Sequence, residues 1–223
     1  MAVVLSAVLG FVQGARPVLA VEFVETTGKL TNDDFYRIVS CGAPPGGACH
    51  DPVVRWSARN ASDLRIVLDP VHPDYPGPLA KLMQAALDQA IAQINAAGTA
   101  LHLRRVPTGH AAPVVVYLTP AGDGERIFGT GEAGIDGEII GAGLTTIWWN
   151  DAHEITNAYI VLSGDLPASE VASVMLEELT QSMGLMTDIR NRAYDSISVF
   201  SEDSNSVTRL GPQDLMALRR HYP

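Results

Sequence analysis

The sequence has few cysteines, little clustered positive charge and no apolar run long enough for a membrane span after its first residues. The formal net charge is −10 at pH 7, and the only adjacent basic pairs are Arg104–Arg105 and Arg219–Arg220. Because phosphate binding depends on clustered Lys and Arg, we expect no nucleic-acid partner. A Gly-x-Ser-x-Gly motif is also absent, so the sequence gives no support for a serine hydrolase of the kind that carries this motif.

The two cysteines, Cys41 and Cys49, flank a segment rich in Gly and Pro. Such a segment closes a small loop easily, whereas a metal clip or a catalytic thiol needs further partners that this spacing does not supply. We therefore expect a Cys41–Cys49 disulfide, which suits an exported protein.

Export is indicated by the first twenty residues. Residues 2–12 are apolar except for Ser6, and Val18-Leu19-Ala20 is typical of a signal-peptide cleavage site. The stretch is shorter than the roughly 20 apolar residues of a membrane helix. We expect a signal peptide at residues 1–20 and a periplasmic or secreted protein without a membrane span.

The rest of the chain has the length of one domain, and its elements indicate an α+β fold. Residues 21–63 have no steady periodicity and are interpreted as an N-terminal extension, and residues 64–223 as the domain itself. We expect a mixed, twisted sheet of about five strands with one backing helix, a second helix that carries the candidate site, and a C-terminal helix from Pro212. The expected strands are residues 64–68, 100–106, 114–118, 145–149 and 158–162, and the backing helix starts at Pro78 and ends near Gly98.

Residues 122–143 contain eight glycines and predict a long loop. Within it, residues 129–134 match the dinucleotide fingerprint by letter, but no helix pattern follows to present its N-terminus to a pyrophosphate. We therefore do not interpret the loop as a nucleotide site.

The most specific signal lies in a helix expected between Pro167 and Gly184. At about 100° per residue, Glu178 falls within the apolar arc of this helix, and Glu177 and Gln181 lie next to it. A carboxylate in such a position loses hydration and needs a partner. That partner is either a hydrogen-bond donor in a purely structural role or a ligand in a functional one.

Residues 177–181 read Glu-Glu-Leu-Thr-Gln, which keeps the spacing of the His-Glu-x-x-His motif of zincin metallopeptidases without either histidine. Residues four apart on a helix can share one metal ion, and the residue after the first faces the bound water. Carboxylate and amide oxygens suit hard cations such as calcium better than zinc. The candidate catalytic residue is Glu178, the candidate ligand-binding residues are Glu177 and Gln181, and Glu177, Gln181 and Asp188 are the candidate metal ligands if a divalent cation binds.

The run from Glu177 to Leu185, followed by Asp188 and by Asp195-Ser196-Ile197, resembles the signature of the bacterial domain-of-unknown-function family 2927. The resemblance extends over residues 65–223 as an order of elements, and it implies a zincin-like fold without an established activity. Two departures are present: Ser198-Val199 precede Phe200, and Thr187 occupies the position where metzincins have their last metal ligand, with Asp188 one residue later.

These patterns lead to three hypotheses. The first is an exported, zincin-like protein that is catalytically degenerate and keeps its cleft for a peptide or a cell-envelope component. The second is an unconventional metal-dependent peptidase with Glu178 as general base. The third is a structural envelope protein in which Glu178 is simply a satisfied buried carboxylate.

Overall fold

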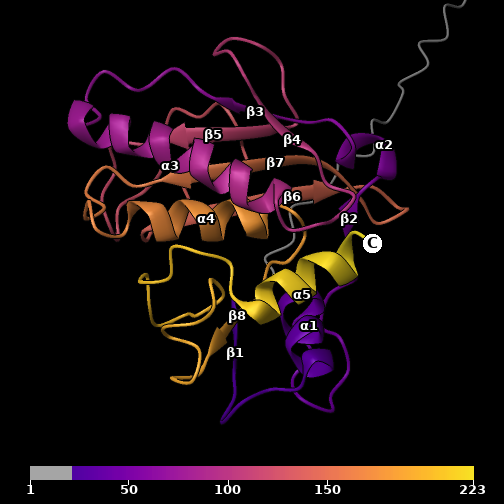
Figure 1. Ribbon diagram of the computed structural model, residues 1–223. Helices are drawn as coiled ribbons and strands as arrows, with labels where there is room; N and C mark the ends of the chain where they lie inside the picture. Colours follow the sequence, from indigo (N-terminus) through magenta and orange to yellow (C-terminus); the bar gives the residue numbers. More distant parts are fainter. Residues whose placement is uncertain (1–21) are drawn as a thin grey trace, which may run out of the picture.

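The computed structural model describes residues 22–223, and the expected signal peptide at residues 1–20 lies outside them. Five helices and eight strands form an α+β fold (Figure 1). Within residues 22–223 no helix has the length and apolar character needed to cross a bilayer.

The main sheet has six strands in the order β2-β7-β5-β3-β4, with β6 also pairing with β7. The strands are β2 (Arg55–Trp56), β3 (Leu64–Leu68), β4 (Leu103–Val106), β5 (Val114–Leu118), β6 (Gly143–Trp149) and β7 (Glu154–Leu162). All pairs are parallel except β6–β7, which is antiparallel. The sheet is therefore mixed, as the sequence predicts, and β6 and β7 form a hairpin.

Helices α3 (Gly77–Asn95) and α4 (Val171–Gln181) lie on one face of the sheet and contact each other (Figure 1). The alternation of β5 explains this layering, because Val116 and Leu118 face the helices whereas Tyr117 faces the other way. Helix α3 matches the predicted backing helix. Helix α4 begins at Val171, four residues later than expected, because residues 168–170 form turns instead.

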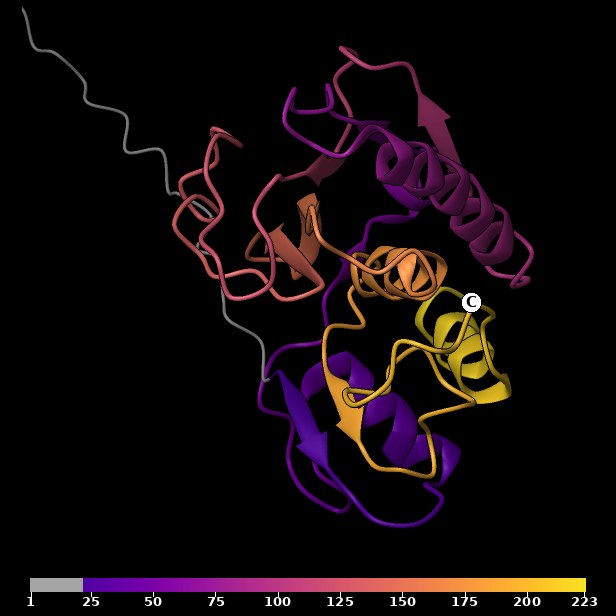
Figure 2. The same ribbon diagram turned by 90° about the vertical axis from the view of Figure 1, so that its left-hand side faces the viewer.

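The glycine-rich loop covers the opposite face of the sheet. Its Ile127, Ile135 and Ile140 are fully buried and pack on Tyr117 and Val161 in a second hydrophobic cluster. Figure 2 shows this loop on the side of the sheet away from α3. The loop thus buries a second sheet face, which accounts for the continuous apolar run in β5.

The N-terminal extension is part of the same core as the rest of the chain. It comprises β1 (Phe23–Glu25), α1 (Asn32–Cys41), β2 and α2 (Ala58–Ala61). Phe35, Ile38 and Trp56 are at most 1% exposed and belong to the main hydrophobic cluster. The boundary predicted at residue 64 therefore does not separate two hydrophobic cores. The extension lacks periodic apolar spacing, but a few large apolar side chains anchor it in the main core.

In the lower part of the molecule in Figure 1, the first elements of the described chain pack against its last ones. Strand β1 pairs in parallel with β8 (Asp188–Arg190), and α1 packs on α5 (Pro212–His221). The expected C-terminal helix begins at Pro212 as predicted, with Leu218 and Tyr222 buried. The expected disulfide between Cys41 and Cys49 is present and closes the loop after α1.

Candidate functional site

Helix α4 is anchored by its apolar face, and a glycine, Gly184, follows three residues after its end at Gln181. Val171, Val174, Met175 and Leu179 are at most 3% exposed, as their helical spacing predicts. Gly184 then takes a φ of 93°, which favours glycine, and a Cβ there would collide with the carbonyl oxygen of Val54. The helix is thereby fixed in rotation, and its polar residues are held in place.

Glu178 points from α4 onto strand β6. Its side chain is 7% exposed. The Oγ1 of Thr145 donates to Glu178 Oε2 at 2.6 Å and to the backbone oxygen of Glu178 at 3.1 Å. A Cβ on Gly143 would lie 2.8 Å from both Cγ and Cδ of Glu178, so the absence of a side chain at residue 143 makes room for the carboxyl group.

Gln181, one helical turn later, points to strand β8 instead. Its Nε2 donates to both carboxylate oxygens of Asp188, at 3.0 and 3.1 Å. Both side chains are buried, at 7% and 8% exposure. The NH₂ group of Gln181 is therefore engaged by Asp188.

Glu177 precedes Glu178 on α4 and is half-buried. Among residues 22–223 it has no hydrogen-bond donor and no ion-pair partner. Glu177, Glu178 and Asp188 are hereafter the α4–β8 carboxylates. Glu178 accepts from the Thr145 hydroxyl and Asp188 accepts from the Gln181 amide, so the carboxylates do not share one donor.

Burial raises the pKa of each α4–β8 carboxylate. Loss of hydration raises the pKa of Glu178 to about 7, and the Thr145 hydroxyl opposes this only in part. Burial also raises the pKa of Glu177 well above its ordinary value, and the negative charges of Asp188 and Glu178 add to the effect. For Asp188 burial is again the main cause, followed by the charge of Glu178, while the Gln181 amide lowers the pKa.

This arrangement suits proton transfer, or an ion pair with a positively charged organic group, better than it suits a metal ion held by three protein ligands. A carboxyl group with a pKa near 7 can act as an acid or a base at neutral pH. Within residues 22–223, however, no three His, Cys, Asp or Glu side chains converge in a way that could hold one metal ion. The Gln181 amide also presents its NH₂ group to Asp188, so the predicted set of Glu177, Gln181 and Asp188 does not fit a metal in this conformation, and we derive no metal-dependent step.

The histidines are distributed away from α4. His153 lies in the exposed turn between β6 and β7, with a φ of 58°, and Glu154 beside it is exposed too, so neither approaches α4. His221 differs from His153 in burial, since its side chain is fully buried at the end of α5. Its Nδ1 is 3.1 Å from the Tyr36 hydroxyl and its Nε2 is 2.9 Å from the carbonyl oxygen of Val54.

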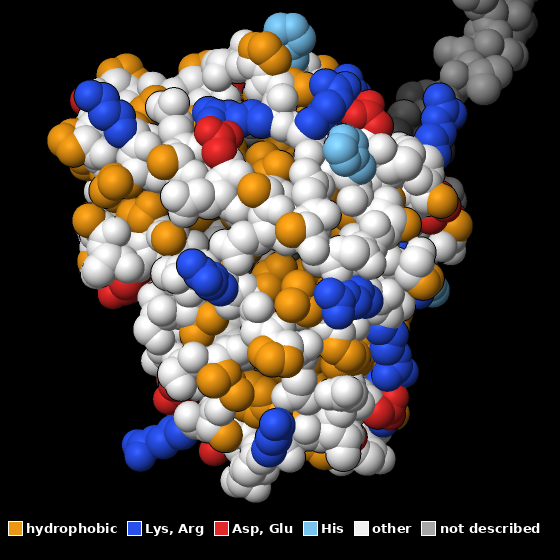
Figure 3. Space-filling model, in the orientation of Figure 1, with side chains coloured by type: hydrophobic (Ala, Val, Ile, Leu, Met, Phe, Trp, Pro, Cys, Tyr) orange, Lys and Arg blue, Asp and Glu red, His pale blue; other side chains and the backbone are white. Residues whose placement is uncertain are grey.

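The two basic pairs noted in the sequence are engaged within the chain. Arg104 pairs with Asp63, Arg105 with Asp88 and Arg220 with Asp33, while Arg219 donates to the carbonyl oxygen of Ala97. On the face shown in Figure 3, Lys and Arg side chains are scattered and do not form one continuous patch.

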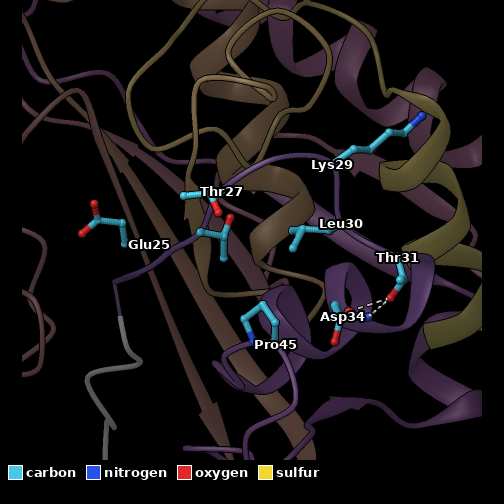
Figure 4. A pocket seen from close by; sticks show the side chains of 8 residues that line it. Glu25, Thr27, Lys29, Leu30, Thr31, Asp34 and Pro45 are labelled. Atoms are coloured by element: carbon cyan, nitrogen blue, oxygen red, sulfur yellow. Dashed lines mark hydrogen bonds between the residues drawn. The ribbon is translucent and has the colours of Figure 1, made fainter.

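A groove of about 600 Å³ lies beside the N-terminal extension, apart from α4. Figure 4 shows that its lining comes from the segment after β1 and from α1, and that Lys29 points away from the other side chains. Thr31 and Asp34 cap α1 by bonding to each other, with Thr31 Oγ1 donating to the Asp34 carboxylate at 2.8 Å and accepting from the Asp34 amide at 3.1 Å. These polar groups thus have a structural role in the start of α1.

Strand β6 forms an unpaired edge of the sheet next to Glu178, although its Thr145 and Ile147 are buried, at 8% and 3% exposure. It pairs with β7 on one side, and among the described residues no strand pairs with its other side. A small cavity at the end of this edge is lined by Ile147 and Trp149 of β6, by Ser40 of α1 and by Gly184, Met186 and Thr187 after α4. The sequence did not single out Gly143 and Thr145, because a glycine in a glycine-rich loop and a threonine in a strand are common, and only their position opposite Glu178 makes them distinctive.

Comparison with known proteins gives one family assignment. No curated protein matches the chain. Residues 53–223 match the profile of the family described as "Protein of unknown function (DUF2927)", which covers more than half of the sequence. The matched region contains α4, β6 and β8, and hence all the residues of the candidate site. The chain therefore belongs to the DUF2927 family.

Proposed function

We propose that this protein is an exported, catalytically degenerate relative of the zincin metallopeptidases that binds an extended peptide along the outer edge of β6. The observation that carries the proposal is the position of this unpaired strand edge directly beside Glu178 of α4. The Glu-Glu-x-x-Gln sequence on α4 supports the zincin-like part, since it keeps the helical spacing of a metal-binding motif without its histidines.

The hydrogen-bond pattern of β6 identifies the groups that a peptide can reach. The amide of Ser163 donates to the carbonyl oxygen of Ala142, so every second residue of β6 from Leu144 onward directs its backbone polar groups to β7. Gly143, Thr145 and Ile147 then direct theirs to the open edge. An extended peptide can add as a strand there, because main-chain hydrogen bonds give affinity without a deep pocket.

The charge of the site favours a basic peptide. Glu178 lies beside this unpaired edge, and none of the α4–β8 carboxylates has an ion-pair partner among residues 22–223. A Lys or Arg side chain of the peptide offers the missing cation, and complementary charge gives both specificity and a faster association.

Fluorescence anisotropy with labelled pentapeptides tests the proposal. We expect Ala-Val-Lys-Val-Ala to bind about tenfold more tightly than Ala-Val-Glu-Val-Ala, a difference of about 1.4 kcal/mol. Glu177→Gln is expected to weaken binding of the Lys peptide, whereas Glu154→Gln, which removes an exposed carboxylate at the start of β7, leaves it unchanged. If the peptide adds as a strand, only every second peptide amide donates to β6. N-methylation of that set of amides then abolishes binding, whereas N-methylation of the other set does not. Equal affinities for the Lys and Glu peptides, or indifference to N-methylation, contradict the proposal.

A second candidate is the metal-dependent peptidase with Glu178 as general base, which is favoured by the pKa of about 7 for that group. Metal analysis of the purified mature protein separates the two candidates. A transition metal at one equivalent, together with peptide cleavage that a chelator stops and Glu178→Gln abolishes, supports the peptidase. Binding without cleavage and without metal supports the degenerate protein.

A further inference from the structure

The small cavity at the end of the β6 edge has room for one small side-chain group. Its volume is about 20 Å³, close to the space that a single water-sized group needs. Ile147 and Trp149 of β6, Met186 after α4 and Ser40 of α1 contribute to its lining. The cavity is thus assembled from three segments that are far apart in the chain, and its walls are mostly apolar.

Ser40 brings an unsatisfied hydroxyl group to this cavity. The residue is 6% exposed, and its Oγ is buried without a hydrogen-bond partner among residues 22–223. The amide of Thr187 donates to the carbonyl oxygen of Val39 at 3.3 Å, so the end of α1 is held against the turn after α4 at this point. A buried hydroxyl without a partner costs free energy, and a polar group that enters the cavity and bonds to it removes that cost.

The alternation of β6 relates the cavity to Glu178. Thr145 contacts Glu178 through its hydroxyl, and Ile147 belongs to the hydrophobic cluster on the same side of the sheet. Both residues direct their backbone polar groups to the unpaired edge. Residues directly opposite each other on neighbouring strands carry their side chains on the same face. In an added strand, the residue opposite Thr145 therefore lies at Glu178, and the residue two positions along, opposite Ile147, lies at the cavity.

We propose that the cavity at Ser40 is a subsite for the side chain of a serine, located two residues from the basic residue of the bound peptide. The inference rests on the proposed function and adds a residue preference to it. A hydroxymethyl group has the size that the cavity admits. Its oxygen can donate to Ser40 Oγ or accept from it, so one hydrogen bond forms in either direction.

Heptapeptides with a fixed lysine test the subsite by fluorescence anisotropy. Ala-Ala-Val-Lys-Val-Ser-Ala and Ala-Ser-Val-Lys-Val-Ala-Ala place the serine on either side of the lysine, because an added strand runs parallel or antiparallel to β6. At one of the two positions we expect serine to bind about fivefold more tightly than α-aminobutyrate, which has a methyl group in place of the hydroxyl. Leucine there should weaken binding about tenfold relative to serine, because it overfills the cavity.

The variant Ser40→Ala identifies the protein group that recognises the serine. Because Ser40 Oγ has no partner in the described chain, its removal leaves no other group unpaired, and the variant is expected to keep its Tm. The serine and α-aminobutyrate peptides should then bind equally, while lysine remains preferred to glutamate at the central position. Ser206→Ala, at an exposed serine between β8 and α5, is the control in which the fivefold preference persists.

Two results overturn the inference: equal affinities for serine and α-aminobutyrate at both positions, or a serine preference that survives Ser40→Ala. If lysine is still preferred to glutamate in either case, the proposed function stands without the subsite. If the lysine peptides do not bind at all, the proposed function fails and the subsite fails with it.

Discussion

Helices α4 and α5 both bury titratable side chains, but they treat them in opposite ways. Asp214 of α5 is fully buried and accepts from Ser198 Oγ at 2.6 Å and from the amides of Gly211 and Val199 at 2.7 and 3.1 Å. Glu178 of α4 is almost as buried and accepts from the single hydroxyl of Thr145. The α5 carboxylate is therefore satisfied within the fold, whereas the α4 carboxylate is left short of donors among the described residues.

His221 extends the contrast on the side of α5. The carbonyl oxygen of Val54 can only accept, so Nε2 carries the proton and Nδ1 accepts from the Tyr36 hydroxyl. Both ring nitrogens of the neutral form are satisfied. Burial accordingly lowers the pKa of His221 to about 4, because a charged ring would lose hydration and face the nearby Arg55 charge, and the hydrogen bond to the Val54 carbonyl oxygen opposes this only in part.

The largest expected effect is the loss of the Asp214 network. Asp214→Ala leaves the Gly211 and Val199 amides and the Ser198 hydroxyl without their acceptor and removes the cap of α5. We expect the free energy of unfolding to fall by about 4 kcal/mol, measured by urea denaturation. The exposed carboxylate Asp203 provides the control, since Asp203→Ala should change stability by less than about 0.5 kcal/mol. A loss of similar size in both variants removes the contrast between the two helices.

Glu178→Gln is expected to act in the opposite direction. The folded pKa of about 7 lies above the ordinary value of 4.5, so ionisation disfavours the folded state as pH rises between these values. The neutral amide avoids this cost and still accepts from Thr145. We expect the variant to be more stable than the native protein by about 3 kcal/mol at pH 8 and equally stable near pH 4. Denaturation at both pH values measures this, and a variant less stable at pH 8 assigns Glu178 to the fold.

His221→Gln tests the buried titratable group of α5, for which the pH dependence of stability is opposite to that of Glu178. The folded pKa of about 4 lies below the ordinary 6.5, so the native protein loses stability as pH falls from 6.5 toward 4. This contribution amounts to about 2 kcal/mol at pH 5 and vanishes at pH 8. We expect the stability difference between native protein and variant to shift by that amount between the two pH values. His153→Gln, in the exposed turn, should shift nothing, and the same pH dependence in both variants argues against the buried histidine as its source.

The smallest expected effect concerns the contact between α4 and β6. Gly143→Ala places a methyl group against Cγ and Cδ of Glu178 and should destabilise the protein by about 1 to 2 kcal/mol. In a Glu178→Ala background the space is free, so the same substitution should cost less than about 0.5 kcal/mol. A double-mutant cycle by thermal denaturation measures this coupling, and additive effects show that Gly143 does not make room for Glu178.

Periodicity predicted the elements well where burial follows one face. Strands 64–68 and 114–118, the backing helix and the helix from Pro212 agree closely with the structure, because alternating or helical apolar spacing reflects which face is covered. The strand expected at residues 100–106 is shorter, at Leu103–Val106, because the Leu101 amide bonds to Thr99 Oγ1 and the Ala100 amide to the Tyr222 carbonyl oxygen instead of to a neighbouring strand.

The candidate site was predictable only in part. The burial of Glu178 and Gln181 followed from helical geometry, but the sequence grouped Glu177, Glu178 and Gln181 toward one shared ligand. In the structure Glu178 turns to β6 and Gln181 to β8, since each side chain takes the donor or acceptor that the neighbouring strand presents. Asp188 was among the candidates, yet its contact with the Gln181 amide depends on the turn after Gly184.

The amino-acid sequence by itself determined the α+β class, the family, the disulfide and the rotation of α4, because these depend on local spacing and composition. The tertiary structure alone decided that the glycine-rich loop covers the second face of the sheet, that β6 keeps an open edge, and that the start of the described chain joins Asp188. Each of these depends on pairing between residues far apart in the chain, and no short-range pattern encodes which distant partner a strand edge or a buried carboxylate will meet.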